Sequence, residues 1–285
     1  MRILMAQLAP TPGDLERNVE RVVSVVRSSR SDLAVFPELF LSGYRVGDRL
    51  HRLALKEGDR SVVLLSTVAH ETGTTLVVGA PVASRVRVGE VHNAALAVTP
   101  DGEYRFQVKR YLPTFGPFEE GVPFTPTDQS SPMRLSGVMV GLEVCYDVFF
   151  PEVSRELALG GAELLVAISA APVTSRRLFD RLLPARAIEN AVPFVYVNRV
   201  GVEDGVVFGG GSGAWNARGD PMPSTPVRLD SSVPEESLAT VEVDTTEAAR
   251  WRPFRPVLRD VSGRPAPREA TGPRSTSGSP PARPL

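Results

Sequence analysis

The chain has 285 residues, 32 basic and 33 acidic side chains, one Cys and 42% hydrophobic residues, so it can bury a substantial core. A net charge of -1 without a dense Lys or Arg run argues against nucleic acid or an anionic membrane as a partner. One Cys excludes an intramolecular disulfide, and no stretch reaches the roughly 20 apolar residues of a membrane span. The first residues lack a signal-peptide pattern, so we expect a cytoplasmic protein that acts on a small molecule or on another protein.

Short β-branched runs alternate with amphipathic segments in the first half of the chain, which predicts strands covered by helices. The apolar residues after Asp14 recur at helical spacing, and Asp14 is suited to cap that helix. A Pro-Asp-Gly turn at 100–102 indicates a hairpin. The expected strands are 2–8, 32–36, 74–79, 91–98 and 103–108, and the expected helices are 14–29 and 60–71.

The second half repeats this pattern and then changes composition. Residues 262–285 contain six Pro, three Gly and four Ser with almost no apolar side chains, which predicts a disordered tail after one domain at 1–261. Pro184 should start or kink its helix. The expected strands are 137–144, 164–169, 194–198 and 238–243, the expected helices are 151–159 and 176–191, and a hairpin is expected at 216–220.

Cys145 follows an expected strand and precedes Tyr146, Asp147 and a Pro-started helix. Residues at the carboxyl ends of strands face ligand crevices in α/β folds, although a lone intracellular Cys is commonly a small buried side chain. The three His residues lie in a charged segment, a helix end and a hairpin strand. Neither a Cys–His pair nor a metal site is therefore indicated.

Two other side chains can work with this thiol. Glu38 ends an expected strand, where an acid belongs either to a solvated loop or to a site. Lys109 ends a hairpin strand and is one of two Lys in a chain that otherwise uses Arg, which suggests a need for a compact, titratable ammonium. The loop 111–120 is rich in aromatic residues and suits a pocket wall. Together these groups supply a nucleophile, a proton shuttle and a stabiliser of negative charge.

Three stretches resemble the carbon-nitrogen hydrolase, or nitrilase, superfamily: PELFLSGY (37–44), KRYLPTFGPFEEGVPF (109–124) and GLEVCYDVFFPE (141–152). They occur in the family's order, and similarity continues to residue 220. The resemblance implies an α/β fold, a four-layer α-β-β-α sandwich, with homodimers or larger homo-oligomers and no cofactor.

The resemblance assigns a catalytic triad to Glu38, Lys109 and Cys145. Glu120 matches the second acid of the family's Lys loop, and the Tyr146 backbone N–H would join Lys109 in stabilising an oxyanion. Glu38 would accept the thiol proton, protonate the departing amine and activate the water that hydrolyses the thioester. The resemblance thus assigns a residue to each step, and no step requires a metal.

The resemblance also bears on the substrate. Tyr146 after the nucleophile is similar to amidase branches, whereas nitrile-cleaving members commonly have Trp there, so we expect a small linear amide or N-carbamoyl compound. Phe149 replaces an Arg often seen in the ω-amidase-like branch. Phe115, Phe149 and Arg176 are candidate substrate-binding residues. Arg176 can bind a carboxylate or belong to a solvated helix face.

Three alternatives stay open. The loop LPTFGPFEE (112–120) also resembles the glutaminase domains of NAD synthetases, so the chain could supply ammonia from glutamine, although we expect no fused synthetase after residue 261. A catalytically silent binding or scaffold protein could share the fold, against which the intact triad argues. Acyl transfer to an amine would differ from hydrolysis only in the final acceptor.

Overall fold

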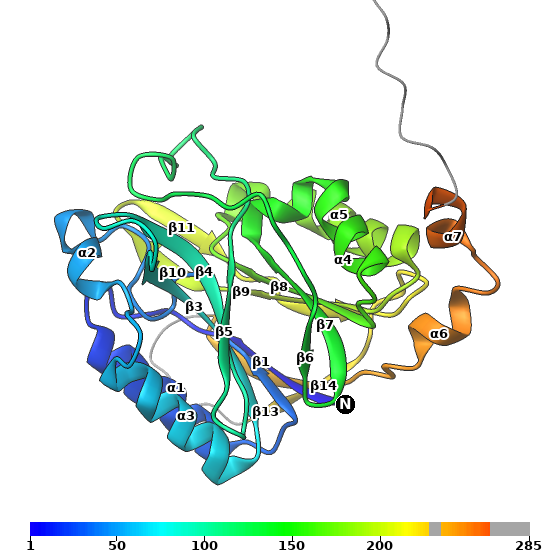
Figure 1. Ribbon diagram of the computed structural model, residues 1–285, viewed down its shortest axis with the longest axis horizontal. Helices are drawn as coiled ribbons and strands as arrows, with labels where there is room; N and C mark the ends of the chain where they lie inside the picture. Colours follow the sequence, from blue (N-terminus) through cyan, green and yellow to red (C-terminus); the bar gives the residue numbers. More distant parts are fainter. Residues whose placement is uncertain (228–234, 263–285) are drawn as a thin grey trace, which may run out of the picture.

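Two β-sheets form the centre of the computed structural model, which describes residues 1–227 and 235–262 (Figure 1). The larger sheet has the order β13-β14-β1-β2-β3-β4-β5, and its strands are β1 (Arg2–Gln7), β2 (Leu33–Val35), β3 (Thr75–Ala83), β4 (Val91–Val98), β5 (Tyr104–Val108), β13 (Ser224–Val227) and β14 (Ser237–Glu242). The smaller sheet has the order β12-β9-β8-β7-β6, and its strands are β6 (Met133–Leu135), β7 (Val138–Val144), β8 (Leu164–Ser169), β9 (Phe194–Asn198) and β12 (Gly213–Trp215). A separate hairpin joins β10 (Val200–Glu203) to β11 (Val206–Gly209).

Successive side chains along a strand point to opposite faces of its sheet and pack in different layers. On β1, Ile3 and Met5 pack toward the second sheet, whereas Leu4 and Ala6 pack toward helices. Val144 on β7 belongs to the same core between the sheets. The sheets therefore stack face to face, and each keeps an outer face for helices.

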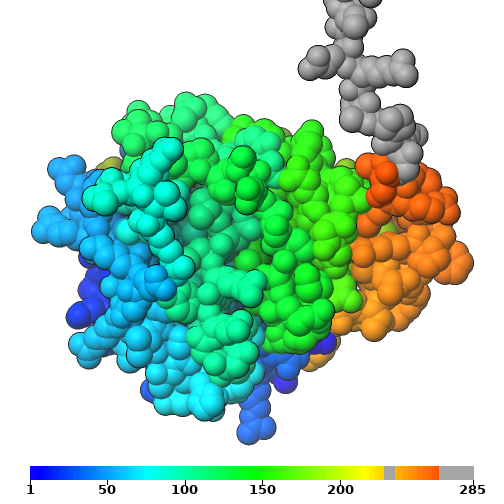
Figure 2. Space-filling model, viewed as in Figure 1, coloured from blue at the N-terminus to red at the C-terminus, as the bar shows by residue number. Residues whose placement is uncertain are grey.

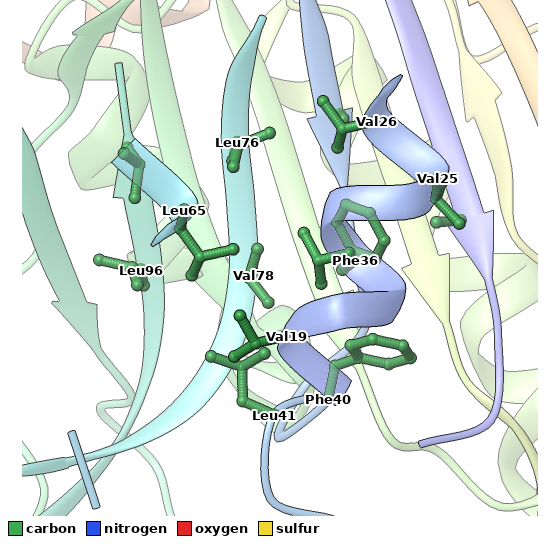
Figure 3. Close-up of a cluster of buried hydrophobic side chains, with 14 of the residues drawn as sticks. Val19, Val25, Val26, Phe36, Phe40, Leu41, Leu65, Leu76, Val78 and Leu96 are labelled. Carbon is green, nitrogen blue, oxygen red and sulfur yellow. The ribbon is translucent and has the colours of Figure 1, made fainter. Parts of the chain in front are cut away.

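Helices α1 (Leu15–Ser28) and α3 (Arg60–Thr72) cover the outer face of the larger sheet (Figure 1). Figure 3 shows Val19 of α1 and Leu65 of α3 beside Val78 of β3. The Asp14 carboxylate accepts the Arg17 amide at 3.1 Å, which confirms Asp14 as the N-cap. The predicted amphipathic helix thus forms one outer layer.

Helices α4 (Pro151–Leu159) and α5 (Arg176–Asn190) cover the smaller sheet with Leu157 and Phe179. Pro184 neither starts nor ends α5; the helix runs through it to its last residue. Two short helices, α6 (Glu247–Trp251) and α7 (Val257–Ser262), lie at one end of the molecule, and α7 contacts α4 and α5 (Figure 2, orange).

The four layers are the α-β-β-α sandwich that the resemblance implied. Sequence reasoning missed short elements such as the β10–β11 hairpin and α2 (Leu50–Leu53), because segments of a few residues carry too little periodicity. Most of the predicted tail, residues 263–285, lies outside the described residues. Across 1–227 and 235–262, no helix has the length and apolar character needed to cross a bilayer.

Candidate active site

Glu38 lies just after β2 in a turn that is held against β3. The Phe36 and Leu41 amides donate to the Val77 and Gly79 carbonyls at 2.8 and 3.1 Å. A Cβ on Gly79 would lie 2.5 Å from the Glu38 Cα, so a residue with a side chain would push the turn away. The Glu38 side chain is fully buried as a result.

Lys109 and Cys145 each follow the end of a strand. The Lys109 amide donates to the Asn93 carbonyl at 2.8 Å and extends the ladder between β4 and β5 by one residue. Cys145 begins a 3₁₀ helix (Cys145–Phe149) after β7 and has φ of 50°, a left-handed conformation that costs free energy for a residue with a side chain. The turn ends the alternation of β7 and leaves Cys145 half-buried beside a cavity.

Lys109 lies between two carboxylates. Its Nζ donates to Glu38 Oε1 at 2.7 Å and to Glu120 Oε1 at 2.8 Å, and all three side chains are buried. Asn93 Nδ2 donates to Glu38 Oε1 at 2.8 Å, and the Ala170 amide donates to Glu38 Oε2 at 2.7 Å. An ammonium has three donors, so one remains after both carboxylates are bound.

The electrostatics of this cluster favour a thiol over a thiolate at rest. Burial raises the pKa of Cys145 above its ordinary value, Glu38 raises it further, and Lys109 only partly opposes them. Burial alone would lower the pKa of Lys109, but Glu120 and Glu38 outweigh it and raise that pKa. A thiol in this environment needs a base nearby before it can act as a nucleophile.

Tyr44 connects the cluster to the β10–β11 hairpin. Its hydroxyl donates to Glu120 Oε1, and its backbone amide donates to Glu203 Oε1 at 2.9 Å. Glu203 pairs with buried Arg199 at 2.5 Å, and the Arg199 guanidinium lies 4.0 Å from the Phe208 ring centroid. Sequence reasoning missed this support because Tyr44 lies 159 residues from Glu203 in the chain.

Asp147 joins the Cys145 turn to the Lys109 loop. Its Oδ1 accepts the Arg110 and Tyr111 amides at 3.1 and 2.9 Å, and its Oδ2 accepts the Val144 amide at 3.2 Å. Burial raises the pKa of Asp147 to about 7, although these donors oppose the rise. The signal available in the sequence was an acid two residues after the single Cys.

A second buried acid, Glu143, lies two residues before Cys145. By the alternation of β7 it points away from the other sheet, and Ser154 of α4 donates to its Oε1 at 2.7 Å. Its Oε2 has no hydrogen-bond partner among the residues that the structure describes, and burial raises its pKa to about 8. Arg186 lies close by and donates from Nε to the Val148 carbonyl at 2.8 Å, which supports the 3₁₀ helix.

The cavity brings most of the predicted site residues together. Phe115, Tyr146 and Phe149 line it with Cys145 and Glu120. Tyr146 is the second residue of the 3₁₀ helix, where backbone N–H groups have no acceptor within the helix. Four candidates from two segments, the loop after Lys109 and the 3₁₀ helix, thus lie around Cys145.

The cavity does not include Arg176. Its Nη1 donates to the Gly209 carbonyl at 3.4 Å, and its side chain lines a different hollow with Gln7 and Ser212. The predicted contact with a substrate carboxylate therefore has no support in its position. Within the described ranges, no three His, Cys, Asp or Glu side chains are grouped as a metal site.

Comparison with known proteins identifies the family. The model of the carbon-nitrogen hydrolase family matches residues 2–253. The chain belongs to the carbon-nitrogen hydrolase family. An (R)-stereoselective amidase of Pseudomonas sp. is 34% identical to this carbon-nitrogen hydrolase over 218 residues, which cover 74% of this chain and 76% of that protein.

A glutamine-dependent NAD(+) synthetase of Thermotoga maritima is also 34% identical, over 262 residues that cover 88% of this chain. The match spans only 43% of the length of that synthetase. The family is therefore shared by amidases and by portions of larger synthetases, and sequence identity alone does not separate the two.

Solved structures share the fold. An amidase of Nesterenkonia sp. AN1 from the nitrilase superfamily has a TM-score of 0.75 and 28% identity, and the match covers 91% of this chain and 93% of that one. In other structures of that amidase, acrylamide or the acetamide moiety of fluoroacetamide is covalently added at the active-site cysteine. The carbon-nitrogen hydrolase of Helicobacter pylori G27, at 24% identity and a TM-score of 0.79, matches in fold.

Proposed function

We propose that this carbon-nitrogen hydrolase is a thiol amidase that cleaves the C–N bond of a small linear amide, or of an N-carbamoyl compound, to give an acid and ammonia. The observation that carries the proposal is the buried Lys109, bound to Glu38 and Glu120, together with half-buried Cys145, which lines the cavity. These groups supply the base, the cation and the nucleophile of acyl transfer.

In the first half-reaction, Cys145 Sγ attacks the amide carbonyl while Glu38 accepts the thiol proton. The remaining Lys109 donor and the Tyr146 backbone N–H stabilise the oxyanion. The C–N bond then breaks as Glu38 passes its proton to the nitrogen, and ammonia leaves a thioester on Cys145. The carboxylate of Glu38 is thereby regenerated.

In the second half-reaction, Glu38 takes a proton from water as the water attacks the thioester carbonyl. Collapse of this intermediate breaks the C–S bond and releases the acid, and Glu38 returns the proton to sulfur. Glu120 keeps Lys109 in place throughout, because its carboxylate accepts a hydrogen bond from the ammonium at 2.8 Å and another from the Tyr44 hydroxyl. Glu120 is therefore assigned a positioning role.

A second candidate is a glutaminase-type subunit that supplies ammonia to a partner. The 34% identity to the T. maritima NAD(+) synthetase favours it. Glutamine turnover by the isolated chain, at a rate that exceeds turnover of simple amides, would support this candidate over a general amidase.

Ammonia release from a panel of small amides, N-carbamoyl compounds, glutamine and aliphatic nitriles tests the proposal. We expect release from amides by the wild type and none above background by Cys145→Ala. A matched control, Ser136→Ala, changes a side chain of similar size remote from the cavity and should retain activity. Amide hydrolysis that survives in Cys145→Ala would overturn the proposal.

We also propose that the chain assembles as a homodimer or a larger homo-oligomer, as the family resemblance implies. Light scattering coupled to size-exclusion chromatography measures the mass directly. A mass that stays at one chain across the working concentration range would contradict this expectation.

A further inference from the structure

The cavity beside Cys145 is small, with a volume of about 80 Å³, and its walls are mostly apolar. Aromatic rings form a continuous wall: centroids of Phe115 and Tyr146 are 5.2 Å apart, those of Tyr146 and Phe149 are 5.3 Å apart, and those of Phe149 and Phe179 are 5.3 Å apart. An apolar group placed against this wall loses water from its own surface and from the rings.

None of the described residues that line the cavity is a cation that could pair with a carboxylate on the acyl group. Among the described residues that line it, Glu120 is the only charged one, and its carboxylate is already bound by Lys109 and Tyr44. Lys109 is shared by two carboxylates, so the cluster with Glu38 carries a net negative charge while the thiol keeps its proton. The guanidinium of Arg176 lies at another hollow.

A carboxylate in this cavity would lose its hydration and gain no opposite charge. Burial of an unpaired charge is among the most costly changes in a protein interior, and the net negative cluster adds repulsion. An amide with an apolar acyl group meets neither cost. Of two acyl groups of similar shape, the uncharged one should therefore bind and react better than the charged one.

Resting on the proposed amidase activity, we propose that this site selects amides whose acyl group is uncharged and apolar, and that it rejects amides bearing a carboxylate, glutamine included. The outer rim extends the same chemistry, because Phe115 and Leu178 line the cavity although they are 55% and 48% exposed. An acyl chain that outgrows the inner cavity meets these two apolar side chains before it reaches solvent.

A pair of substrates of nearly equal shape tests this selectivity. In 4-methylpentanamide an isopropyl group occupies the place of the carboxylate of succinamate, and glutamine carries an ammonium and a carboxylate on a longer chain. We expect kcat/KM for 4-methylpentanamide to exceed that for succinamate and for glutamine by about 100-fold or more. Equal or higher kcat/KM for either charged amide, with release that depends on Cys145, overturns the selectivity and leaves the amidase activity standing.

Substitution at the rim tests the cause of the selectivity. Leu178→Arg places a guanidinium beside the cavity and should raise kcat/KM for succinamate about tenfold, because Arg binds carboxylates in a bidentate geometry. Leu159→Arg is the matched control: Leu159 is 43% exposed on α4 and does not line the cavity, so the substrate ratio should not change. An unchanged ratio in Leu178→Arg, or an equal change in both variants, contradicts the assigned cause.

The measurements distinguish a failure of the proposed amidase function from a failure of the proposed selectivity. If no amide of either kind is hydrolysed by the folded wild type, the proposed amidase function fails. If amides are hydrolysed and the charged ones are favoured, only the apolar selectivity fails.

Discussion

Two buried ionic clusters lie on either side of Tyr44, and only one of them borders the Cys145 cavity. In the first, Lys109 is shared by Glu38 and Glu120 and keeps one donor unused. In the second, Arg199 pairs with Glu203 at 2.5 Å and stacks on Phe208. The side chains of both clusters are buried, so burial alone does not show which cluster takes part in the proposed reaction.

The difference lies in access and in charge balance. The Lys109 cluster has two carboxylates for one cation, and Glu120 reaches the cavity wall. In the second cluster, Glu203 is neutralised by Arg199 and also accepts the Tyr44 and Arg45 amides at 2.9 and 2.6 Å. We therefore expect changes in the first cluster to affect catalysis and changes in the second to affect stability.

The largest expected effect is on the first cluster. Lys109→Arg should fold but lose activity by about a thousandfold, because a planar guanidinium cannot place one donor on each carboxylate and a third on the oxyanion in the same space. Lys56→Arg, at the only other Lys and on the surface, is the matched control and should behave as wild type. Near-normal kcat in Lys109→Arg would remove this ammonium from the mechanism.

The second cluster should respond in stability. Arg199→Met leaves Glu203 buried without its cation, and we expect the free energy of unfolding to fall by about 3 kcal/mol in denaturant titrations. Arg27→Met, which breaks an exposed pair with Glu71, should cost less than about 1 kcal/mol. The double variant Arg199→Met, Glu203→Gln should recover part of the loss. A loss of equal size in both single variants would refute the distinction between the clusters.

A smaller effect, on the pH dependence of stability, is expected from Glu143, which belongs to neither cluster. Its pKa is about 8 in the folded chain against 4.5 as the ordinary value, so between these pH values the folded state holds a proton that the unfolded state has lost. Its contribution to stability therefore falls as pH rises from about 4.5 to 8. Glu143→Gln removes that dependence.

The thermal midpoints of wild type and Glu143→Gln should be similar at pH 5. At pH 9 the midpoint of the variant should be higher by a few degrees, which corresponds to roughly 1 kcal/mol or more in the free energy of unfolding. Glu242→Gln, at an exposed acid, should show no such trend. A gap that does not widen with pH would show that Glu143 is not held in its protonated form.

Sequence could predict the elements with clear periodicity and the residues in contiguous motifs. The buried strands, the capped helix after Asp14 and the placement of Glu38, Lys109 and Cys145 just after strands all belong to this class. What it could not predict depends on distant partners: Glu203 lies 159 residues from Tyr44, and Glu143 needs Ser154 on the next helix. For Arg176 the sequence predicted the helix, but it could not predict which hollow the side chain lines.

In the proposed reaction, Cys145 carries the acyl group as a thioester between two half-reactions. Partitioning of the acyl group between water and added hydroxylamine tests it directly, with 4-methylpentanamide and the methyl ester of the same acid as substrates. A common thioester predicts the same ratio of acid to hydroxamate from both substrates, with both products absent in Cys145→Ala. A ratio that depends on the leaving group, or products that persist without the thiol, would contradict the account.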